Sequence, residues 1–406
     1  MRNGELECMK KAKFKMTEIG LIPADWEVKR LGDCATIARG GSPRPIESYL
    51  TTQPDGLNWV KIGDVTVGAK YIEKTAERIL PSGLSSTREV KSGDFLLSNS
   101  MSFGRPYIMK ISGCIHDGWL VIQDYKNDFD QEFLYYVLGS DLVLKQYATY
   151  AAGSSVLNLN KDVVSRVVVM TPSLAEQKAI AEVLSDVDAL IAAQEELIEK
   201  KRAIKQGAMQ ELFAMRNGEC GMRNVPRRRL PGFSGEWVEK RLGEVLTIGN
   251  GKDYKHLTSG TIPVYGTGGL MTYVNDWLYD GATVCIGRKG TIDVPQYHEG
   301  KIWTVDTLYY TYDFKDVDIK FLYYLFLRID WLSYNSATGV PSLTAKAICD
   351  IEVVLPTLAE QRAIAKVLSD MDAEISELEA QKAKFESIKQ GMMQELLTGK
   401  TRLKGA

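Results

Sequence analysis

The chain has 406 residues, of which 45% are hydrophobic and 25% charged, and its formal net charge is −2. This length predicts two globular units plus connecting structure, and the composition excludes a disordered or fibrous protein. No run of about 20 uninterrupted apolar residues occurs, and the charged residues 1–15 lack an apolar signal core. We therefore expect neither a membrane span nor export, which places the protein in the cytoplasm.

The residues that metal and redox sites require are scattered. The six cysteines form no Cys-x-x-Cys pair, and the three histidines are far apart in sequence. The spacing of a zinc finger is therefore absent, and reduced thiols without a metal site are expected.

Two enzymatic motifs are also missing. Amino-methyltransferases hold the flipped base with an Asn/Asp-Pro-Pro-Tyr/Phe loop, but the chain contains no Pro-Pro pair, and it has no Walker nucleotide-binding loop. We predict a protein without a catalytic site of its own.

The chain contains an internal repeat, which fixes its architecture. Residues 26–33 (WEVKRLGD) are echoed by residues 237–244 (WVEKRLGE). Residues 172–212 match residues 356–396 without a gap, with 25 of 41 positions identical. Between these blocks the two halves resemble each other only in patches. A frame that is duplicated while its contents diverge indicates a protein that reads two different things.

In chain order, the repeat divides the sequence into alternating bodies and helices. We expect an N-terminal extension, a first recognition body, a first helix, a basic linker, a second recognition body, a second helix and a tail, at residues 1–15, 16–172, 173–214, 215–235, 236–356, 357–398 and 399–406. The linker holds the densest basic patch, Arg223 and residues 227–229. This patch suits contact with a DNA backbone or a partner, and equally a solvated linker.

Both bodies are predicted to be α/β (α+β) domains with short strands. In each, a strand ends in a small-residue loop that carries an arginine, at residues 98–106 and 287–291. Such a loop suits a cation at a base edge or phosphate, and an ordinary glycine turn fits the spacing as well. A second loop of small residues, at residues 153–156 and 339–342, precedes the helix in each half and suits phosphate contact or simple loop closure. The candidate DNA-binding residues are Ser102, Arg105, Gly153, Ser154, Ser155, Lys252, Tyr254, Lys255, Arg288, Lys289 and Ser342.

Both repeated segments read as long helices of a coiled coil. Ser173 with Glu176, and Thr357 with Glu360, form capping-box patterns. Apolar residues then recur in heptads over five to six repeats. The residues predicted to pack between the helices or against a partner are Ile180, Val187, Leu190, Leu197 and Ile204 in the first helix and Ile364, Met371, Leu378, Phe385 and Ile388 in the second.

Connectivity predicts that these two helices run antiparallel. The first leads from one body to the other and the second returns, and each would be about 60 Å long at 1.5 Å per residue. Each helix carries eight acidic and five basic residues, so the rest of the chain is net +4. We expect an acidic ruler that joins mildly basic bodies, a charge of the right sign for DNA. Two amphipathic helices packed on their own domains are the alternative.

These residues resemble a known family. Residues 20–33 (GLIPADWEVKRLGD) are similar to the entry of a target-recognition domain, and residues 174–181 (LAEQKAIA), with their second copy, are similar to the repeated helix of type I restriction–modification specificity subunits. The ending LLTGKTRL at residues 396–403 also resembles that family. The resemblance covers nearly the whole chain.

The resemblance implies a pseudo-twofold protein in which two target-recognition domains each read one half of an interrupted, asymmetric DNA site. The helices would set the spacer and dock two methyltransferase subunits. It also implies that partner subunits carry S-adenosylmethionine, ATP and magnesium, and that restriction subunits add ATP-driven cleavage. The alternative is a DNA-recognition or scaffold subunit of a different multisubunit modification or phage-defence system.

Overall fold

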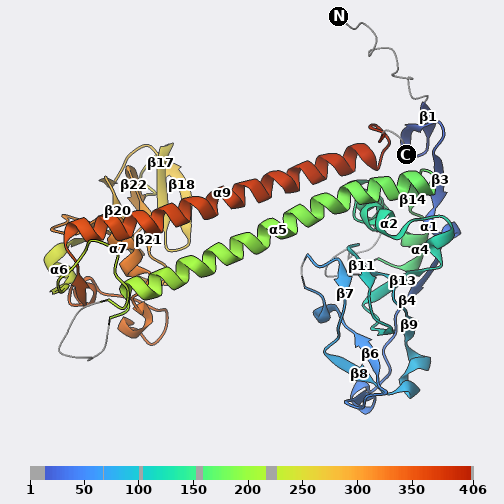
Figure 1. Cartoon of the computed structure of the whole chain (residues 1–406), viewed down its shortest axis with the longest axis horizontal. Coiled ribbons are helices and arrows are strands. Elements are labelled where there is room, and N and C mark those ends of the chain that lie inside the picture. Colours follow the sequence, from blue (N-terminus) through green and yellow to red (C-terminus); the bar gives the residue numbers. More distant parts are fainter. Residues whose placement is uncertain (1–13, 67, 100–103, 152–158, 216–225, 404–406) are drawn as a thin grey trace, which may run out of the picture. The chain divides into compact units, whose positions relative to one another are not determined.

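The structure is a computed structural model that describes residues 14–403, apart from 67, 100–103, 152–158 and 216–225. The chain divides into two compact units: unit 1 comprises Met1–Ala193 and Lys382–Ala406, and unit 2 comprises Gln194–Gln381. Two long helices, α5 (Leu174–Phe213) and α9 (Leu358–Leu396; Figure 1), each contribute one segment to either unit. Each unit thus holds one recognition body and two antiparallel helix segments.

The body of unit 1 contains two five-stranded sheets. The first has the order β4 (Thr36–Arg39), β13 (Trp119–Gln123), β10 (Phe95–Ser98), β11 (Pro106–Met109), β7 (Tyr71–Ile72). The second has the order β5 (Leu50–Thr51), β8 (Glu77–Ile79), β6 (Leu57–Val60), β12 (Gly113–Ile115), β9 (Arg88–Val90). Two antiparallel pairs add β1 (Phe14–Thr17) with β2 (Gly20–Pro23), and β3 (Glu27–Arg30) with β14 (Val168–Thr171). The α-helices are α1 (Leu31–Cys34), α2 (Gln131–Leu138), α3 (Asp141–Ala151) and α4 (Lys161–Ser165).

The body of unit 2 repeats this plan with two four-stranded sheets. One has the order β16 (Thr247–Asn250), β23 (Leu308–Tyr312), β20 (Thr283–Gly287), β21 (Gln296–His298). The other has the order β18 (Gly269–Val274), β17 (Ser259–Gly266), β22 (Lys301–Thr304), β19 (Tyr279–Asp280). β15 (Val238–Arg241) pairs with β24 (Glu352–Leu355), as β3 pairs with β14. The helices are α6 (Leu242–Val245), α7 (Ile319–Phe326) and α8 (Ala345–Cys349), with a 3-10 turn η5 (Trp331–Tyr334).

The start of each long helix is tied to its own body by the same bonds. Gln177 is buried, accepts from the Asp130 N–H and donates to the carbonyls of Asp128 and Pro172. In unit 2 the equivalent Gln361 accepts from the Asp318 N–H and donates to the carbonyls of Asp316 and Pro356. Because both amide groups of each glutamine are satisfied by backbone at the start of α2 or α7, they fix the body to the first turn of the helix.

The predicted capping boxes form only in part. Ser173 Oγ accepts from the Glu176 N–H at 3.2 Å, and Thr357 Oγ1 accepts from the Glu360 N–H at 3.4 Å. The glutamates do not return the bond: Glu176 accepts from Trp26 Nε1 and pairs with Arg402. Glu360 accepts two bonds from Arg229, at 2.8 and 2.7 Å. A buried carboxylate binds an arginine in preference to a backbone N–H because the charge-assisted hydrogen bond is stronger.

This arrangement also settles part of the basic linker. Of its arginines, Arg223 lies outside the described residues. Arg229 is mostly buried and occupied by Glu360 and by the carbonyls of Ser234 and Gly235, so it is not a solvated cation. Arg402, in the tail after α9, occupies the same position on Glu176 in unit 1. The linker and the tail therefore have the same structural role, because each supplies the arginine that pairs with the buried glutamate of one unit.

The predicted pair of long antiparallel helices is confirmed, but four of the ten residues predicted to pack do not lie between the helices. Leu190, Leu197, Ile204 and Ile388 are exposed and face outward. The buried and half-buried positions lie one residue later at those turns, so that the seam of α5 is Leu184, Val187, Ile191, Gln194, Ile198, Lys201, Lys205, Ala208 and Leu212. The seam of α9 is Leu368, Met371, Ile375, Leu378, Lys382, Phe385, Lys389, Met392 and Leu396.

The other predicted packing residues lie inside. Val187, Met371, Leu378 and Phe385 are on the seam, and Ile180 and Ile364 are buried in the two cores. At Ile204 and Ile388 the count of apolar residues missed the seam because the next residue, which does lie on it, is a lysine. Counting back in heptads from Ile204 then gives Leu197 and Leu190 instead of the isoleucines that follow them.

Two of the seam lysines, Lys205 and Lys389, are each held by a tyrosine–aspartate pair that is repeated in the two units. In unit 1, Lys389 of α9 pairs with Asp188 of α5 at 2.6 Å, and Tyr136 of α2 donates to Asp188 at 2.7 Å. In unit 2, Lys205 pairs with Asp372, and Tyr324 of α7 donates to Asp372 at 2.7 Å. The tyrosine ring also lies near the lysine, with 5.6 and 5.4 Å from Nζ to the ring centre. Each cluster joins both helix segments to the body of its unit.

The corrected seam predicts different costs for two neighbouring substitutions in α5. Ile198 is 4% exposed and Leu197 37% exposed. Ile198→Ala removes buried methyl groups and is expected to lower the free energy of unfolding by about 2–5 kcal/mol. Leu197→Ala should change it by less than about 1 kcal/mol. Denaturant unfolding of both variants measures this, and equal losses would favour the seam predicted from the sequence.

Candidate nucleic-acid interface

One edge of the β16-β23-β20-β21 sheet gathers most of the predicted residues of unit 2. Strands β16 and β20 end there and β23 begins there, because β23 is antiparallel to both. Lys252, which follows β16, donates its N–H to the Thr304 carbonyl, and Arg288, which follows β20, donates its N–H to the Thr307 carbonyl. Lys252 is thus bound to the end of β22, and Arg288 is bound to the turn that leads from β22 into β23.

Arg288 and Lys289 project from a turn that requires glycine. A Cβ at Gly287 would lie 2.0 Å from the Thr291 carbonyl oxygen, and Gly290 has φ +96°. Both cations are exposed, and the Arg288 guanidinium lies 5.8 Å from the centre of the Tyr309 ring. Stacking over an aromatic face holds the planar guanidinium in one orientation. With Ser342 and other residues these cations line a hollow of about 490 Å³.

The predicted loop before α8 closes this hollow. Lys289 forms an antiparallel bridge with Ser342, and the Gly290 N–H donates to the Pro341 carbonyl at 2.8 Å. The structure therefore brings together Arg288, Lys289 and Ser342, which lie far apart in sequence.

The segment after β16 contains two exposed lysines and one tyrosine that packs inward. Lys252 and Lys255 are exposed at the sheet edge. Tyr254 is half-buried and packs against the small cluster around Val264 and Trp303. Its ring supports the loop, so the two lysines are the better candidates for contact with a phosphate.

In unit 1 the same frame carries different side chains. Asn99, which follows β10, donates its N–H to the Gly118 carbonyl and accepts from the Leu159 N–H. Arg288 makes the same bonds with Thr307 and Leu343. Asn99, however, is buried, and its amide donates to the Asp117 carbonyl. An exposed arginine in unit 2 thus corresponds to a buried structural asparagine in unit 1.

The turn before β13 forms a polar cluster at this edge of unit 1. Asp117 Oδ1 accepts from Ser42 Oγ at 3.1 Å and lies 2.9 Å from His116 Nε2. His116 Nδ1 accepts from the Gly118 N–H at 3.0 Å, so the proton of the neutral imidazole is on Nε2. Arg39 Nε donates to the Asp117 carbonyl.

A groove of about 890 Å³ lies beside that cluster and is lined by Ser42, Arg44, Trp59, Lys61, His116 and Asp117 among others. Lys61 is paired with Glu77 at 2.5 Å, whereas Arg44 is exposed. Extending the 211-residue offset of the repeat aligns Arg44 with Lys255, although residues 41–45 share no identity with residues 252–256. Sequence reasoning named Lys252 and Lys255 but missed Arg39, Arg44 and His116. The offset alone could have indicated Arg44, and it does not indicate Arg39 or His116.

Arg105 lies at the start of β11, at the same edge of its sheet. It is half-buried, with its guanidinium 6.0 Å from the centre of the Tyr107 ring. Ser102, Gly153, Ser154 and Ser155 lie outside the described residues. Their proposed contact with DNA stays a prediction.

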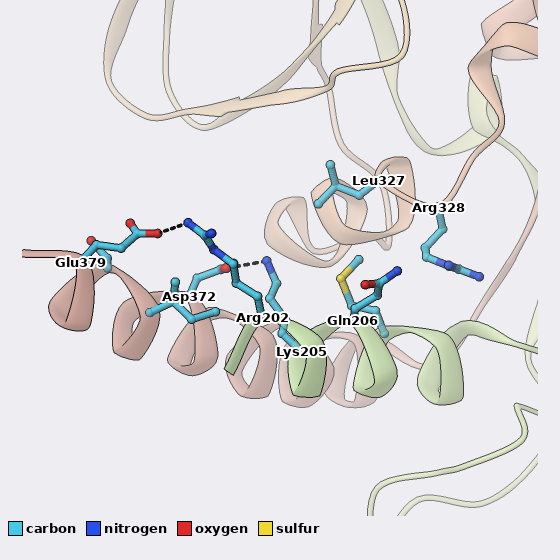
Figure 2. Close-up of a pocket in the computed structure, with 10 residues that line it drawn as sticks. Arg202, Lys205, Gln206, Leu327, Arg328, Asp372 and Glu379 are labelled. Atoms are coloured by element: carbon cyan, nitrogen blue, oxygen red, sulfur yellow. Dashed lines mark hydrogen bonds and ion pairs between the residues drawn. The ribbon is translucent and has the colours of Figure 1, made fainter. Parts of the chain in front are cut away.

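A second hollow in unit 2, of about 570 Å³, differs from the sheet edge in that most of its cations are paired (Figure 2). Arg202 and Lys205 of α5 line it together with Arg328, which follows α7. The cations of α5 are already paired there, Arg202 with Glu379 and Lys205 with Asp372 (Figure 2). Because these pairs cancel the charge, this hollow attracts a polyanion less than the edge with Arg288 and Lys289.

Other kinds of site find little support in the described part of the chain. It contains no group of three or more His, Cys, Asp or Glu that could hold a metal ion. Burial lowers the pKa of His298 to about 4, and its ring stacks on Tyr265, so this half-buried histidine is neutral at physiological pH. No helix among the described residues is long and apolar enough to cross a membrane.

Two equivalent sheet edges with different polar side chains define a duplicated recognition protein, and comparison with known sequences gives its family. The type I restriction modification DNA specificity domain matches residues 23–201 and 234–386. The chain belongs to this family.

Relatives match over the whole length. The type I restriction enzyme MjaVIII specificity subunit of Methanocaldococcus jannaschii is 23% identical over 98% of both chains. The putative MjaX specificity subunit of the same organism is 26% identical over 98% of this chain and 99% of its own.

Solved structures share the fold. A chain from a study of complex assembly and conformational transition of the type I restriction–modification system superposes with a TM-score of 0.62, at 16% identity, over 94% of this chain and 99% of its own. The S subunit of M. genitalium superposes with a TM-score of 0.57, at 18% identity, over 92% and 96%. The expected fold of two recognition domains with a pair of long helices is confirmed.

Two cations of the unit 2 edge are expected to act differently on DNA. Arg288→Gln should cost about 1–3 kcal/mol of discrimination at one base pair, because an arginine reads guanine through two bonds. Lys255→Gln should weaken binding to all sequences about equally. It should also reduce the slope of log binding constant against log salt concentration by about 1. Titration of the assembled complex with cognate and scrambled duplexes at several salt concentrations measures both. Arg328→Gln, at the hollow of Figure 2, is the control and should change neither.

Proposed function

We propose that this chain is the DNA specificity subunit of a type I restriction–modification complex, in which each unit reads one half of an asymmetric, interrupted site. One observation carries the proposal: the same backbone frame recurs at the sheet edge of both units, with Asn99 buried in one and Arg288 exposed in the other. A shared frame positions DNA in the same way, and different side chains read different bases. The two half-sites therefore differ in sequence.

The long helices would set the spacer between the half-sites. The seam, the two tyrosine–aspartate–lysine clusters and the buried glutamines fix each body to the helix pair. A rigid attachment of this kind transmits helix length into the separation of the two reading surfaces.

The same helices carry a surface suited to a partner that binds twice. Lys200, Ile204, Gly207 and Glu211 of α5 lie on one outer face, and α9 repeats them as Lys384, Ile388, Gly391 and Glu395. Ile204 is 49% and Ile388 42% exposed. Earlier on the same face the two copies differ, with leucines at 190 and 197 against glutamate and glutamine at 374 and 381.

The two glycines of this surface are not required by close packing within the chain. A Cβ at Gly207 or Gly391 would meet nothing within 4 Å. Since glycine inside a helix costs roughly 0.5–1 kcal/mol relative to alanine, their recurrence supports close approach by another protein. We assign this face to two methyltransferase subunits, one for each unit.

The chemistry would then reside in the partners. Methyltransferase subunits would bind S-adenosylmethionine and methylate adenine, and restriction subunits would use ATP and magnesium for cleavage. The chain itself would be non-catalytic and cytoplasmic. A recognition or scaffold subunit of another multisubunit DNA-modification system is the second candidate, favoured by the near-neutral net charge.

Sequencing that detects methylated adenine tests the proposal directly. Deletion of this gene is expected to abolish methylation at one interrupted, asymmetric motif, and its return on a plasmid should restore the same motif. A palindromic motif would contradict the two different reading edges. Unchanged methylation in a host with active partner subunits would favour the scaffold.

The duplicated helix face gives a second prediction. Ile204→Glu should remove one of two bound methyltransferase subunits, and the double variant Ile204→Glu, Ile388→Glu should remove both, because each change puts a charge into an apolar contact. Leu190→Glu is the matched control, since α9 carries Glu374 at the equivalent position. The mass of the purified complexes measures the stoichiometry. Two bound subunits on the double variant would place the contact elsewhere.

A further inference from the structure

Val340 is an exposed apolar side chain inside a cationic recognition surface. It is 55% exposed and lines the hollow of unit 2 together with Arg288, Lys289 and Ser342. A single exposed valine is ordinary on a protein surface. Val340 differs because cations that attract a polyanion line the same hollow. A polyanion bound to those cations would also exclude water from Val340.

The loop that carries Val340 is held in one shape. Asn335 Oδ1 accepts from the N–H groups of Ala337 and Ser342, at 3.0 and 2.9 Å, and its Nδ2 donates to the Ala337 carbonyl at 2.9 Å. The Ser336 N–H donates to the Ser342 carbonyl at 3.0 Å, which closes the loop at its base. Because Pro341 and Ser342, which follow Val340, are also tied to Gly290 and Lys289, the loop presents Val340 at little entropic cost on binding.

Base edges in the major groove offer only one apolar group, the 5-methyl group of thymine. All other features there are hydrogen-bond donors or acceptors, which a valine cannot satisfy. Arg288 and Lys289, which line the same hollow, are suited to the polar and phosphate contacts beside Val340.

We propose that Val340 is a specificity-determining residue that contacts the 5-methyl group of one thymine in the half-site read by unit 2. This inference rests on the proposed function and deepens it, because it names the base and the atom group that the loop recognises.

Replacing thymines one at a time by deoxyuridine tests the inference, because deoxyuridine lacks only the methyl group. The assembled methyltransferase complex is titrated with duplexes that carry the mapped site. For the wild-type chain, one substitution should weaken binding about fourfold, the value of one buried methyl group. Val340→Ala should weaken binding to the thymine duplex by a similar factor and make the complex indifferent to that substitution.

Val238→Ala is the matched control, since Val238 is 58% exposed in the same unit but lies on β15, outside the four-stranded sheet. It should leave the deoxyuridine effect unchanged. Thermal unfolding of each complex checks that both variants fold.

The inference is overturned if no thymine methyl affects wild-type binding, or if Val340→Ala retains the full deoxyuridine effect. An equal loss on every duplex would instead make Val340 a packing residue or a wedge between base steps. A wild-type complex without any preferred site is a different result, because it would refute the proposed function itself.

Discussion

The structure depends on a buried carboxylate in the first turn of each long helix. Glu176 and Glu360 are nearly inaccessible to solvent, and each is neutralised by an arginine from a segment far along the chain. A buried charge that loses its partner costs about 3–5 kcal/mol, so these pairs strongly determine where the linker and the tail lie. Arg402 also pairs with Asp25, and the bond from Arg402 lowers the pKa of the Asp25 carboxyl. The end of the chain is thereby attached to the entry of the first body.

The frame built on these pairs is separate from the residues that would read DNA. Glutamine, tyrosine, aspartate and lysine contacts are the same in both units down to the choice of atom. The sheet edges differ, with a His116–Asp117 cluster in one unit and the Arg288–Lys289 turn in the other. Because the glutamine, tyrosine, aspartate and lysine contacts described for the frame do not involve these edge side chains, the edges can change while the frame is kept. That separation is what a protein needs if its target is to vary while its assembly does not.

The internal repeat made the fold predictable, while the contacts of single side chains were not. Helix boundaries, the caps at Ser173 and Thr357 and the antiparallel pairing follow from local pattern and connectivity. The seam was misplaced because Lys205 and Lys389 lie on it, and each is held there by an aspartate from the other helix that no local pattern indicates. The packing of Tyr254 could not be foreseen because it depends on Trp303, about 50 residues away in sequence. Arg44 could have been found by extending the repeat, whereas the burial of Asn99 could not.

The polar seam has a consequence for the register of the helices. Apolar seams tolerate a shift by a heptad, because one leucine replaces another, whereas a buried polar contact is lost on any shift. Here Lys389 meets Asp188 in unit 1 and Lys205 meets Asp372 in unit 2, and each aspartate is bound by a tyrosine of the adjacent body. A slipped register would leave two aspartates and two lysines without partners at once, and would free both tyrosines from the helices. The seam thus gives up some apolar contact and gains a single allowed alignment, which is the property that a ruler requires.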